Sequence, residues 1–225
     1  MRAVMFVAAV AIVTMFTAGP AFAQMQERVY VTGVGGFATT PDTTSRDVMG
    51  EVGVRVARNL FVFGDLGQFH NLQPSVVQPT VDATTAILAA GQGLNVTGTA
   101  RVPAWYSVGG LRYEVPIHSR LLSPYVLGGL GVARLNPTAQ FTFVSGPMPD
   151  GSTQAAGADV TSQILTAGDF TAPPATTALM FTLGGGAEIP VARHWAIDAG
   201  YRFSRIAATT PLNARGATVG FGYRF

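Results

Sequence analysis

The hydrophobic residues of this chain recur with a period of two. Apolar side chains alternate with polar or small ones over eight segments, and helical periodicity is nearly absent. Each segment has 10 to 13 residues, and a tilted strand of that length rises roughly 28 Å, the thickness of a membrane's hydrocarbon layer. We expect strands at Val29–Ala38, Val48–Ala57, Leu60–Phe69, Ala104–Val115, Ser123–Leu135, Ala178–Ile189, Trp195–Ile206 and Arg215–Phe225.

The last segment shows what the two faces of a strand carry. Large apolar side chains lie on one face, and glycine, threonine and a full charge lie on the other: Ala217, Val219, Phe221, Tyr223 and Phe225 oppose Gly216, Thr218, Gly220, Gly222 and Arg224. The second, sixth and seventh segments follow the same rule. The first, third and fifth alternate less cleanly, so their inward and outward register stays open.

This alternation decides the fold class. Charges are costly against lipid, and unpaired backbone groups are costly too, so the sheet has to close with its apolar face outside. The pattern therefore predicts an all-β fold, an eight-stranded antiparallel up-and-down transmembrane β-barrel.

The connections alternate between long and short. In chain order they hold 9, 2, 34, 7, 42, 5 and 8 residues, and the longest are His70–Pro103 and Asn136–Thr177. Outer-membrane barrels have short periplasmic turns and long external loops, so we expect these two outside the cell. We interpret both as exposed and partly mobile, with too little patterned hydrophobic sequence for a second domain. A short helix capped by Asp82 is expected over Asp82–Ala90.

Residues 1–23 have the features of a secretory signal peptide. Arg2 precedes an apolar run, and Ala21 and Ala23 form a small-x-small cleavage site. The apolar run of 16 residues is shorter than the roughly 20 residues of a membrane span. Cleavage after Ala23 leaves residues 24–225 as one outer-membrane barrel domain, with long external loops at 70–103 and 136–177.

Composition agrees with an exported membrane protein. Charged residues make up 12 % of the chain and Gly 27 of 225 residues, against about 25 % and about 7 % in typical soluble proteins. Removal of Arg2 with the signal peptide lowers the formal net charge from +2 to +1, and this near balance indicates no nucleic-acid partner. Because the chain has no Cys, no disulfide holds it together, and its stability has to come from closure of the sheet or from packing.

Three short motifs carry a resemblance to a known family. Pro124–Gly131 reads PYVLGGLG, and GYRF occurs at Gly200–Phe203 and again at Gly222–Phe225. With the signal peptide, they make the chain resemble the small outer-membrane β-barrel domain proteins of Gram-negative bacteria, the OmpA/OmpX-like eight-stranded barrels. The resemblance implies a location in the cell outer membrane, contact with outer-membrane lipid and lipopolysaccharide, and no cofactor.

The same resemblance gives the chain's end a role. In that family the assembly machinery of the outer membrane recognises a terminal aromatic residue preceded by aromatics at alternate positions. Phe221, Tyr223 and Phe225 match this pattern and are the expected assembly signal.

The inner faces carry the strongest group of charged residues. Five acids and four arginines are expected to form ion pairs inside the lumen: Glu51, Arg55, Asp65, Arg112, Glu114, Glu188, Asp198, Arg202 and Arg224. An eight-stranded barrel has an interior just wide enough for side chains, so we expect a plugged lumen rather than a conducting pore. Arg134 is a further candidate for the inner face. By strand height, Arg224 should lie near Glu188 and Asp198, and Arg55 near Glu51.

The sequence gives only weak indications of a catalytic or metal-binding site. His70 and Ser75 would be the candidates for a lipid-modifying dyad, but no third orienting group is evident, so no catalytic residue is expected. The spacing of Asp150, Asp159 and Asp169 matches no metal-binding loop, so no metal ligand is expected.

Three functions remain open at this stage. The first is a structural or surface-interaction role, in which the external loops make contacts with an external partner that the sequence does not identify. The second is a small transporter or narrow channel for an apolar solute. The remote third is a lipid-modifying barrel enzyme. A pocket above the barrel would favour the transporter if it were lined by Val76, Val77, Ile87, Leu88, Phe141, Phe143 and Ile164.

Overall fold

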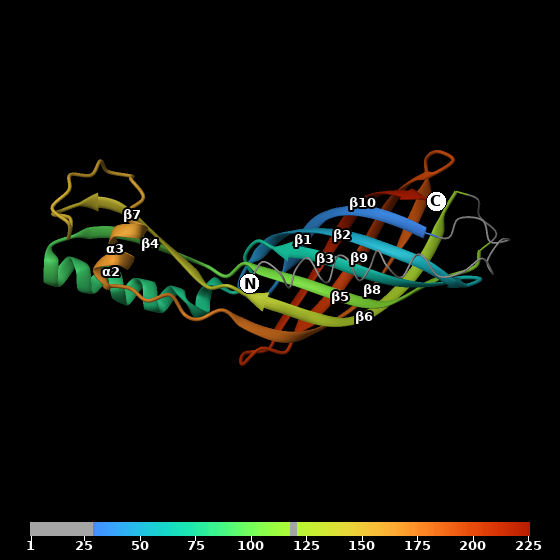
Figure 1. Ribbon diagram of the computed structural model, residues 1–225, viewed down its shortest axis with the longest axis horizontal. Coiled ribbons are helices and arrows are strands. Elements are labelled where there is room, and N and C mark those ends of the chain that lie inside the picture. The colour runs from blue at the N-terminus through green and yellow to red at the C-terminus, as the bar shows by residue number, and fades with distance from the viewer. Residues whose placement is uncertain (1–28, 118–120) are drawn as a thin grey trace.

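The computed structural model describes residues 29–117 and 121–225. The predicted cleavage site at Ala21 and Ala23 lies outside the described residues. The chain forms a barrel and, at one end of it, a narrow extension (Figure 1). The C-terminus lies at the opposite end of the barrel from the extension.

The barrel is closed and has eight strands. Around its circumference the order is β1-β10-β9-β8-β6-β5-β3-β2, and every neighbouring pair is antiparallel. The predicted fold class is therefore confirmed. The strands are β1 (Val29–Thr39), β2 (Thr44–Ala57), β3 (Leu60–Phe69), β5 (Ala104–Glu114), β6 (Ser123–Leu135), β8 (Thr176–Pro190), β9 (Trp195–Ile206) and β10 (Leu212–Arg224).

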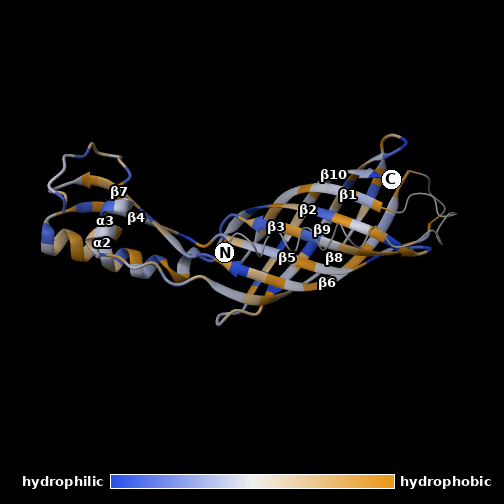
Figure 2. Cartoon of the chain, in the orientation of Figure 1, coloured by the Kyte–Doolittle hydropathy of each residue, from blue (hydrophilic) through white to orange (hydrophobic). Residues whose placement is uncertain are grey.

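The barrel is inside out, as the alternation predicts. Hydrophobic and hydrophilic residues alternate along its strands (Figure 2). The structure also defines the register of β1, β3 and β6, the first, third and fifth predicted segments, which the sequence leaves open. In β3, Phe61, Phe63 and Asp65 are buried, whereas Val62 and Leu66 are exposed on the outer face. The third segment alternates poorly because its inner face carries aromatic rings beside a carboxylate.

Two inward glycines make room for two inward tyrosine rings. A Cβ atom on Gly53 would lie 2.1 Å from the ring of Tyr30, and one on Gly67 would lie 2.5 Å from the ring of Tyr106. The lumen of a small barrel has little spare width. Glycine on one strand therefore lets a large residue of a nearby strand fill the interior.

The two long connections form an extension of the barrel, defined here as residues 70–103 and 136–175. It contains the 3-10 helix η2 (Pro74–Val76), α2 (Gln78–Gln92), β4 (Asn95–Arg101), β7 (Thr138–Ser145) and α3 (Thr161–Ala167). β4 leads directly into β5, and β7 follows β6, so the antiparallel β4–β7 ribbon continues the β5–β6 pair beyond the barrel. Pro103 and Pro137 separate the ribbon from the barrel, because proline lacks the N–H that a ladder needs.

The extension contains a group of buried apolar side chains, which belong to the same cluster as buried residues of the barrel. Val81 and Leu88 of α2, Phe141 of β7 and Ile164 of α3 are all fully buried, and the rings of Phe141 and Phe170 lie 5.2 Å apart. The two connections are therefore not exposed loops throughout, as the sequence analysis expects, because they contain secondary structure and buried side chains. Neither connection alone has enough apolar residues for a core, but the two pack against each other and share one.

The helix in the first connection is longer than the sequence predicts. It begins at Gln78 after Val77, and the Asp82 side chain accepts a hydrogen bond from Gln78 Nε2 at 2.7 Å instead of capping the helix. Tertiary packing of Val81 and Leu88 extends the helix beyond the local capping signal. No helix in the part of the chain that the structure describes is long and apolar enough to cross a membrane.

Candidate functional site

The centre of the lumen is occupied by the guanidinium of Arg112 from β5. It donates to Glu51 Oε1 at 3.1 Å, to Glu188 Oε2 at 2.8 Å and to Asp198 Oδ2 at 3.3 Å. Only 2 % of Arg112 is exposed. The three carboxylates come from β2, β8 and β9, so a single buried cation joins strands from different sectors of the barrel.

Two tyrosines complete the surroundings of Arg112. The guanidinium carbon lies 3.7 Å from the ring centroid of Tyr125 and 4.9 Å from that of Tyr30. The Tyr30 hydroxyl donates to Glu51 at 2.5 Å, and the Tyr125 hydroxyl donates to Asp198 at 2.7 Å. Buried charges are tolerated when they are paired and hydrogen-bonded, and these rings supply both the hydrogen bonds and the packing.

A second arginine crosses the lumen toward the extension. Arg202 of β9 donates to Asp65 Oδ2 on β3 at 2.5 Å and also to Glu51 Oε2. Glu51 thus accepts from both Arg112 and Arg202 and couples the two halves of the network.

The third part of the network lies toward the short turns. Arg224 near the end of β10 donates to Glu188 Oε1 at 2.6 Å and to Glu114 Oε1 at 2.9 Å, and Arg55 lies 3.9 Å from Glu114. Together with the other two parts, these contacts join all nine residues that the sequence analysis expects to form lumen ion pairs.

Some of the expected pairings are wrong. Asp198 pairs with Arg112 instead of Arg224, and Glu51 pairs with Arg112 and Arg202 instead of Arg55. Arg55 lies four residues from Glu51 along β2, about 13 Å at the rise of a strand, so the two side chains occupy different heights.

Arg134 does not belong to the lumen. It is exposed on β6, and its Nε donates to Asn136 at 3.4 Å. The candidate inner position for Arg134 is therefore wrong, because β6 buries the residues on either side of it, Ala133 and Leu135.

Sequence reasoning missed the inward tyrosines and one acid. Tyr30 lies in a strand whose alternation is unclear, and the predicted strand Val48–Ala57 begins one residue after Asp47, whereas β2 begins at Thr44. The Tyr106 hydroxyl donates to Asp47 Oδ1 at 3.0 Å. The signal that could have identified Asp47 is its spacing of four residues from Glu51, which places both on one face of a strand.

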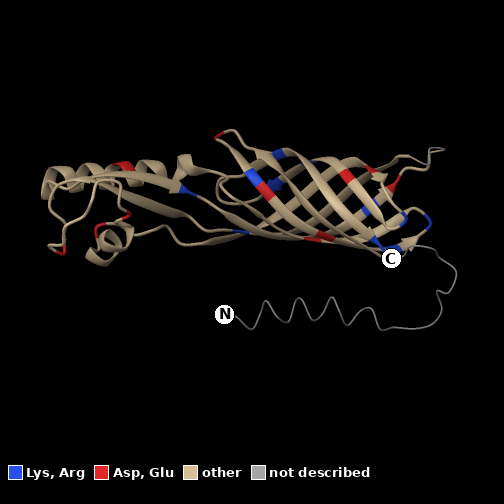
Figure 3. Ribbon diagram, turned by 90° about the horizontal axis from the view of Figure 1, so that it is seen from above, with Lys and Arg blue, Asp and Glu red and all other residues tan. Residues whose placement is uncertain are grey.

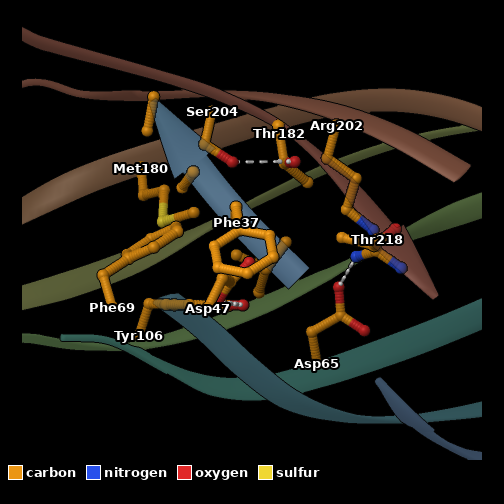
Figure 4. Close-up of a pocket in the computed structure, with 14 residues that line it drawn as sticks. Phe37, Asp47, Asp65, Phe69, Tyr106, Met180, Thr182, Arg202, Ser204 and Thr218 are labelled. Atoms are coloured by element: carbon orange, nitrogen blue, oxygen red, sulfur yellow. Dashed lines mark hydrogen bonds and ion pairs between the residues drawn. The ribbon is translucent and has the colours of Figure 1, made fainter. Parts of the chain in front are cut away.

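The half of the lumen nearest the extension is also filled. Phe69 and Tyr106 pack with ring centroids 4.7 Å apart, and Met180 is buried beside them (Figure 4). The cavity that these side chains share with Asp65 and Arg202 holds only about 10 Å³, room for about one water molecule. The lumen is therefore blocked by aromatic packing at one level and by ion pairs at the next.

The opposite rim carries the predicted assembly signal. Phe221 and Phe225 are exposed and Tyr223 is half-buried on the outer face of β10. The ring of Trp195 stacks on Phe221 and meets the edge of Tyr223, with centroids 4.8 Å apart in both pairs. Aromatic girdles of this kind mark the level of a membrane surface.

The dyad of His70 and Ser75 is not formed. The Ser75 hydroxyl donates to the Asp42 carboxylate in the β1–β2 connection, and His70 is exposed. No hydrogen bond links His70 to Ser75 within the described ranges.

Each of the three loop carboxylates accepts a hydrogen bond. Hydrogen bonds from Ser152 lower the pKa of the Asp150 carboxyl, and those from Thr161 lower the pKa of the Asp159 carboxyl. Asp169 accepts from Gln92 at 3.1 Å. Among residues 29–117 and 121–225, no group of three or more His, Asp or Glu side chains is arranged to hold a metal ion.

Comparisons with known proteins agree with the geometry. The model of the outer membrane protein beta-barrel domain family matches residues 8–225. The chain therefore belongs to this family, the resemblance seen in the sequence is confirmed, and the protein is located in the cell outer membrane. A comparison with curated proteins finds no match.

Two solved structures share the fold. Neisserial surface protein A has a TM-score of 0.54 and 15 % identity, with 88 % of this chain and 97 % of that chain covered. A major outer membrane protein from Thermus thermophilus has a TM-score of 0.54 and 8 % identity, with 88 % and 99 % covered. At these identities the likeness concerns the fold alone.

Proposed function

We propose that this outer-membrane protein acts by surface contact, with the barrel as its anchor and the extension as its contact region. The observation that carries the proposal is the shared apolar core of the two long connections. Keeping two long segments folded together requires the burial of residues such as Phe141 and Ile164. A barrel that served only as a membrane-spanning structure would not need a folded extension outside the membrane.

The orientation follows from the loops. Outer-membrane barrels place short turns in the periplasm and longer loops outside. The connections at Arg58–Asn59 and Val191–His194 are short, and both lie at the end opposite the extension. The extension thus stands outside the cell, where it is available to an external partner.

The filled lumen favours a surface-contact function over transport of solutes through the barrel. The ion pairs of Arg112 and Arg202 cross the interior, and the packed rings of Phe69 and Tyr106 lie above them. We expect no steady flow of ions or solutes through such a barrel.

The transporter remains the alternative, and the placement of its candidate residues does not favour it. Val77, Leu88, Phe141, Phe143 and Ile164 are buried in the core of the extension. Val76 and Ile87, by contrast, are more than half exposed. These residues pack against one another as a core, whereas the cavity inside the barrel is lined by other side chains.

Catalysis is not part of the proposal. A lipid-modifying site would need a nucleophile, a base and an orienting group within hydrogen-bond reach of one another. His70 and Ser75 do not meet that requirement, because Ser75 donates to Asp42.

The test is a shortened protein in living cells. In it, residues 71–101 and 137–174 are each replaced by a short Gly- and Asn-rich turn, and unboiled and boiled samples are compared on a gel to show that the barrel still folds. Adhesion of cells to surfaces and to other cells should fall, while uptake of small apolar solutes should not change. Unchanged adhesion together with impaired uptake would overturn the proposal in favour of the transporter.

A further inference from the structure

The β4–β7 ribbon of the extension has two edges, and the edge on β7 is closed by backbone. The segment that leads into α3 runs beside it. Phe143 N–H donates to Ala158 O at 2.8 Å, and Phe143 O accepts from Gly157 N–H at 2.8 Å. Val160 N–H donates to Phe141 O at 2.9 Å. The outer edge of β7 is therefore already occupied by the protein's own chain.

The edge on β4 is closed by a single side chain. The amide of Gln78, at the start of α2, donates to Gly98 O at 3.1 Å and accepts from Ala100 N–H at 2.9 Å. A glutamine amide offers the same donor and acceptor groups as a peptide unit, so Gln78 takes the place that a third strand would have. Among residues 29–117 and 121–225, no backbone hydrogen bond from outside the ribbon reaches β4.

The sequence of β4 itself gives this edge little protection. Native proteins prevent unwanted pairing of an exposed edge strand with charged side chains, prolines or bulges. β4 contains no Pro, and its one charged residue, Arg101, lies at the end next to the barrel (Figure 3). The irregularity in its pairing with β7 lies at the other end, between Asn95 and Val96. The middle of the edge therefore depends on Gln78.

We propose that the β4 edge is a latent strand-pairing site for a second copy of this protein, and that Gln78 keeps the site closed. Copies in one membrane present their extensions at the same level, so their β4 edges can meet. Main-chain hydrogen bonds supply the affinity when a strand is added to a sheet edge. A second strand has to displace the Gln78 amide from Gly98 and Ala100 first, and this competition keeps the extension a single unit, whichever external partner it contacts.

The test is the oligomeric state of the purified full-length protein in detergent, measured by analytical ultracentrifugation at increasing protein concentration. Gln78→Met keeps the length of the side chain and removes its amide. The association constant of the dimer should rise about thirty-fold over the wild type, the equivalent of two released hydrogen bonds. The matched control is Gln92→Met in the same helix, because the Gln92 amide donates to Asp169 and not to a strand. This control should behave like the wild type.

Digestion with thermolysin shows whether the extension of each variant is still folded. A folded Gln78→Met protein that is no more dimeric than the wild type would overturn the proposal. If Gln78→Met is cut rapidly, Gln78→Asn takes its place, because its amide is one methylene too short to reach both backbone groups of β4. Loss of the folded extension in both variants would assign Gln78 a purely structural role and contradict the proposal.

Cross-linking locates the contact between the two copies. The chain has no Cys, so an introduced cysteine is the only thiol. In the Gln78→Met protein, Thr99→Cys on the exposed face of β4 should be joined to its counterpart in a second copy by a short bismaleimide. Ser162→Cys, at an exposed position of α3, should react far less. Equal or stronger cross-linking through position 162 would place the contact away from β4 and contradict the proposal.

Discussion

Arg202 on β9 and Asp65 on β3 form an ion pair of 2.5 Å between strands that stand opposite each other in the closed barrel. The two residues are 137 positions apart in the sequence. The lumen is therefore so narrow that one arginine and one aspartate side chain together cross it. The same pair also ties together strands that share no backbone hydrogen bonds.

Loss of the central cation should destabilise the barrel strongly. Arg112→Leu leaves Glu51, Glu188 and Asp198 without the guanidinium that they share. Removing one partner of a buried ion pair costs about 3–5 kcal/mol, so the urea midpoint of unfolding in detergent or lipid should fall clearly. Arg58→Leu, in the exposed β2–β3 turn, is the control and should change stability little. An equal midpoint for both variants would show that the network is dispensable.

Deletion of Phe225 should impair assembly and leave secretion intact. Phe221, Tyr223 and Phe225 form an outward stripe at the rim, and we propose that the assembly machinery reads it. Membrane fractionation should find less protein in the outer membrane and more unfolded or degraded protein in the periplasm. Leu130→Ala, at an outward position that is 74 % exposed, should insert normally. Full insertion without Phe225 would disprove the role of the stripe.

The extension should unfold separately from the barrel when its core is opened. Phe141→Ala removes a fully buried ring, a change that costs about 3–5 kcal/mol. Thermolysin suits the measurement, because residues 71–100 and 135–175 contain no Arg or Lys for trypsin. The variant should be cut quickly within the extension while the barrel still migrates as a folded species. Leu165→Ala, at an exposed position, should resist cleavage like the wild type, and rapid cleavage of the wild type would contradict the shared core.

Acid should loosen the attachment of α3 to β7. Asp159 accepts a hydrogen bond from the N–H of Thr161 at 2.9 Å, and the Thr161 hydroxyl accepts one from the N–H of Phe141 at 2.8 Å. Hydrogen bonds from Thr161 lower the pKa of the Asp159 carboxyl in the folded state. Its stabilising effect is thus complete above an aspartate's ordinary pKa of about 4 and is lost as pH falls through the lowered pKa.

Amide hydrogen exchange measures this effect. Protection of the Thr161 and Phe141 N–H groups, corrected for the intrinsic rate at each pH, should decrease on acidification. Asp159→Ala should show the reduced protection already at neutral pH and little further change in acid. Protection that is independent of pH in the wild type would argue against a role for this carboxylate.

The sequence predicts the barrel far better than the extension. Strand alternation is a local signal: the sequence of one strand alone predicts that Phe221 faces outward and Gly222 inward, with no information on the neighbouring strands. The core of the extension brings together residues such as Val81 and Phe141, which belong to different connections and both lie beside Gly98, and no local period in the sequence records that packing. Alternation also identifies the residues that face the lumen, but it does not identify the ion-pair partners of Asp198 and Glu51. Those partners depend on the height of each residue in the barrel, which is set by the stagger between strands.

Conductance tests the central claim most directly, that the barrel is an anchor whose lumen is closed. The purified wild-type protein is inserted into a planar lipid bilayer, with a 16-stranded porin as the positive control for insertion and recording. Because Arg202 and Asp65 cross the lumen and Phe69 and Tyr106 fill it above them, the account predicts little or no steady current. Large, stable single-channel steps from the folded wild-type protein would contradict it and favour a transporter.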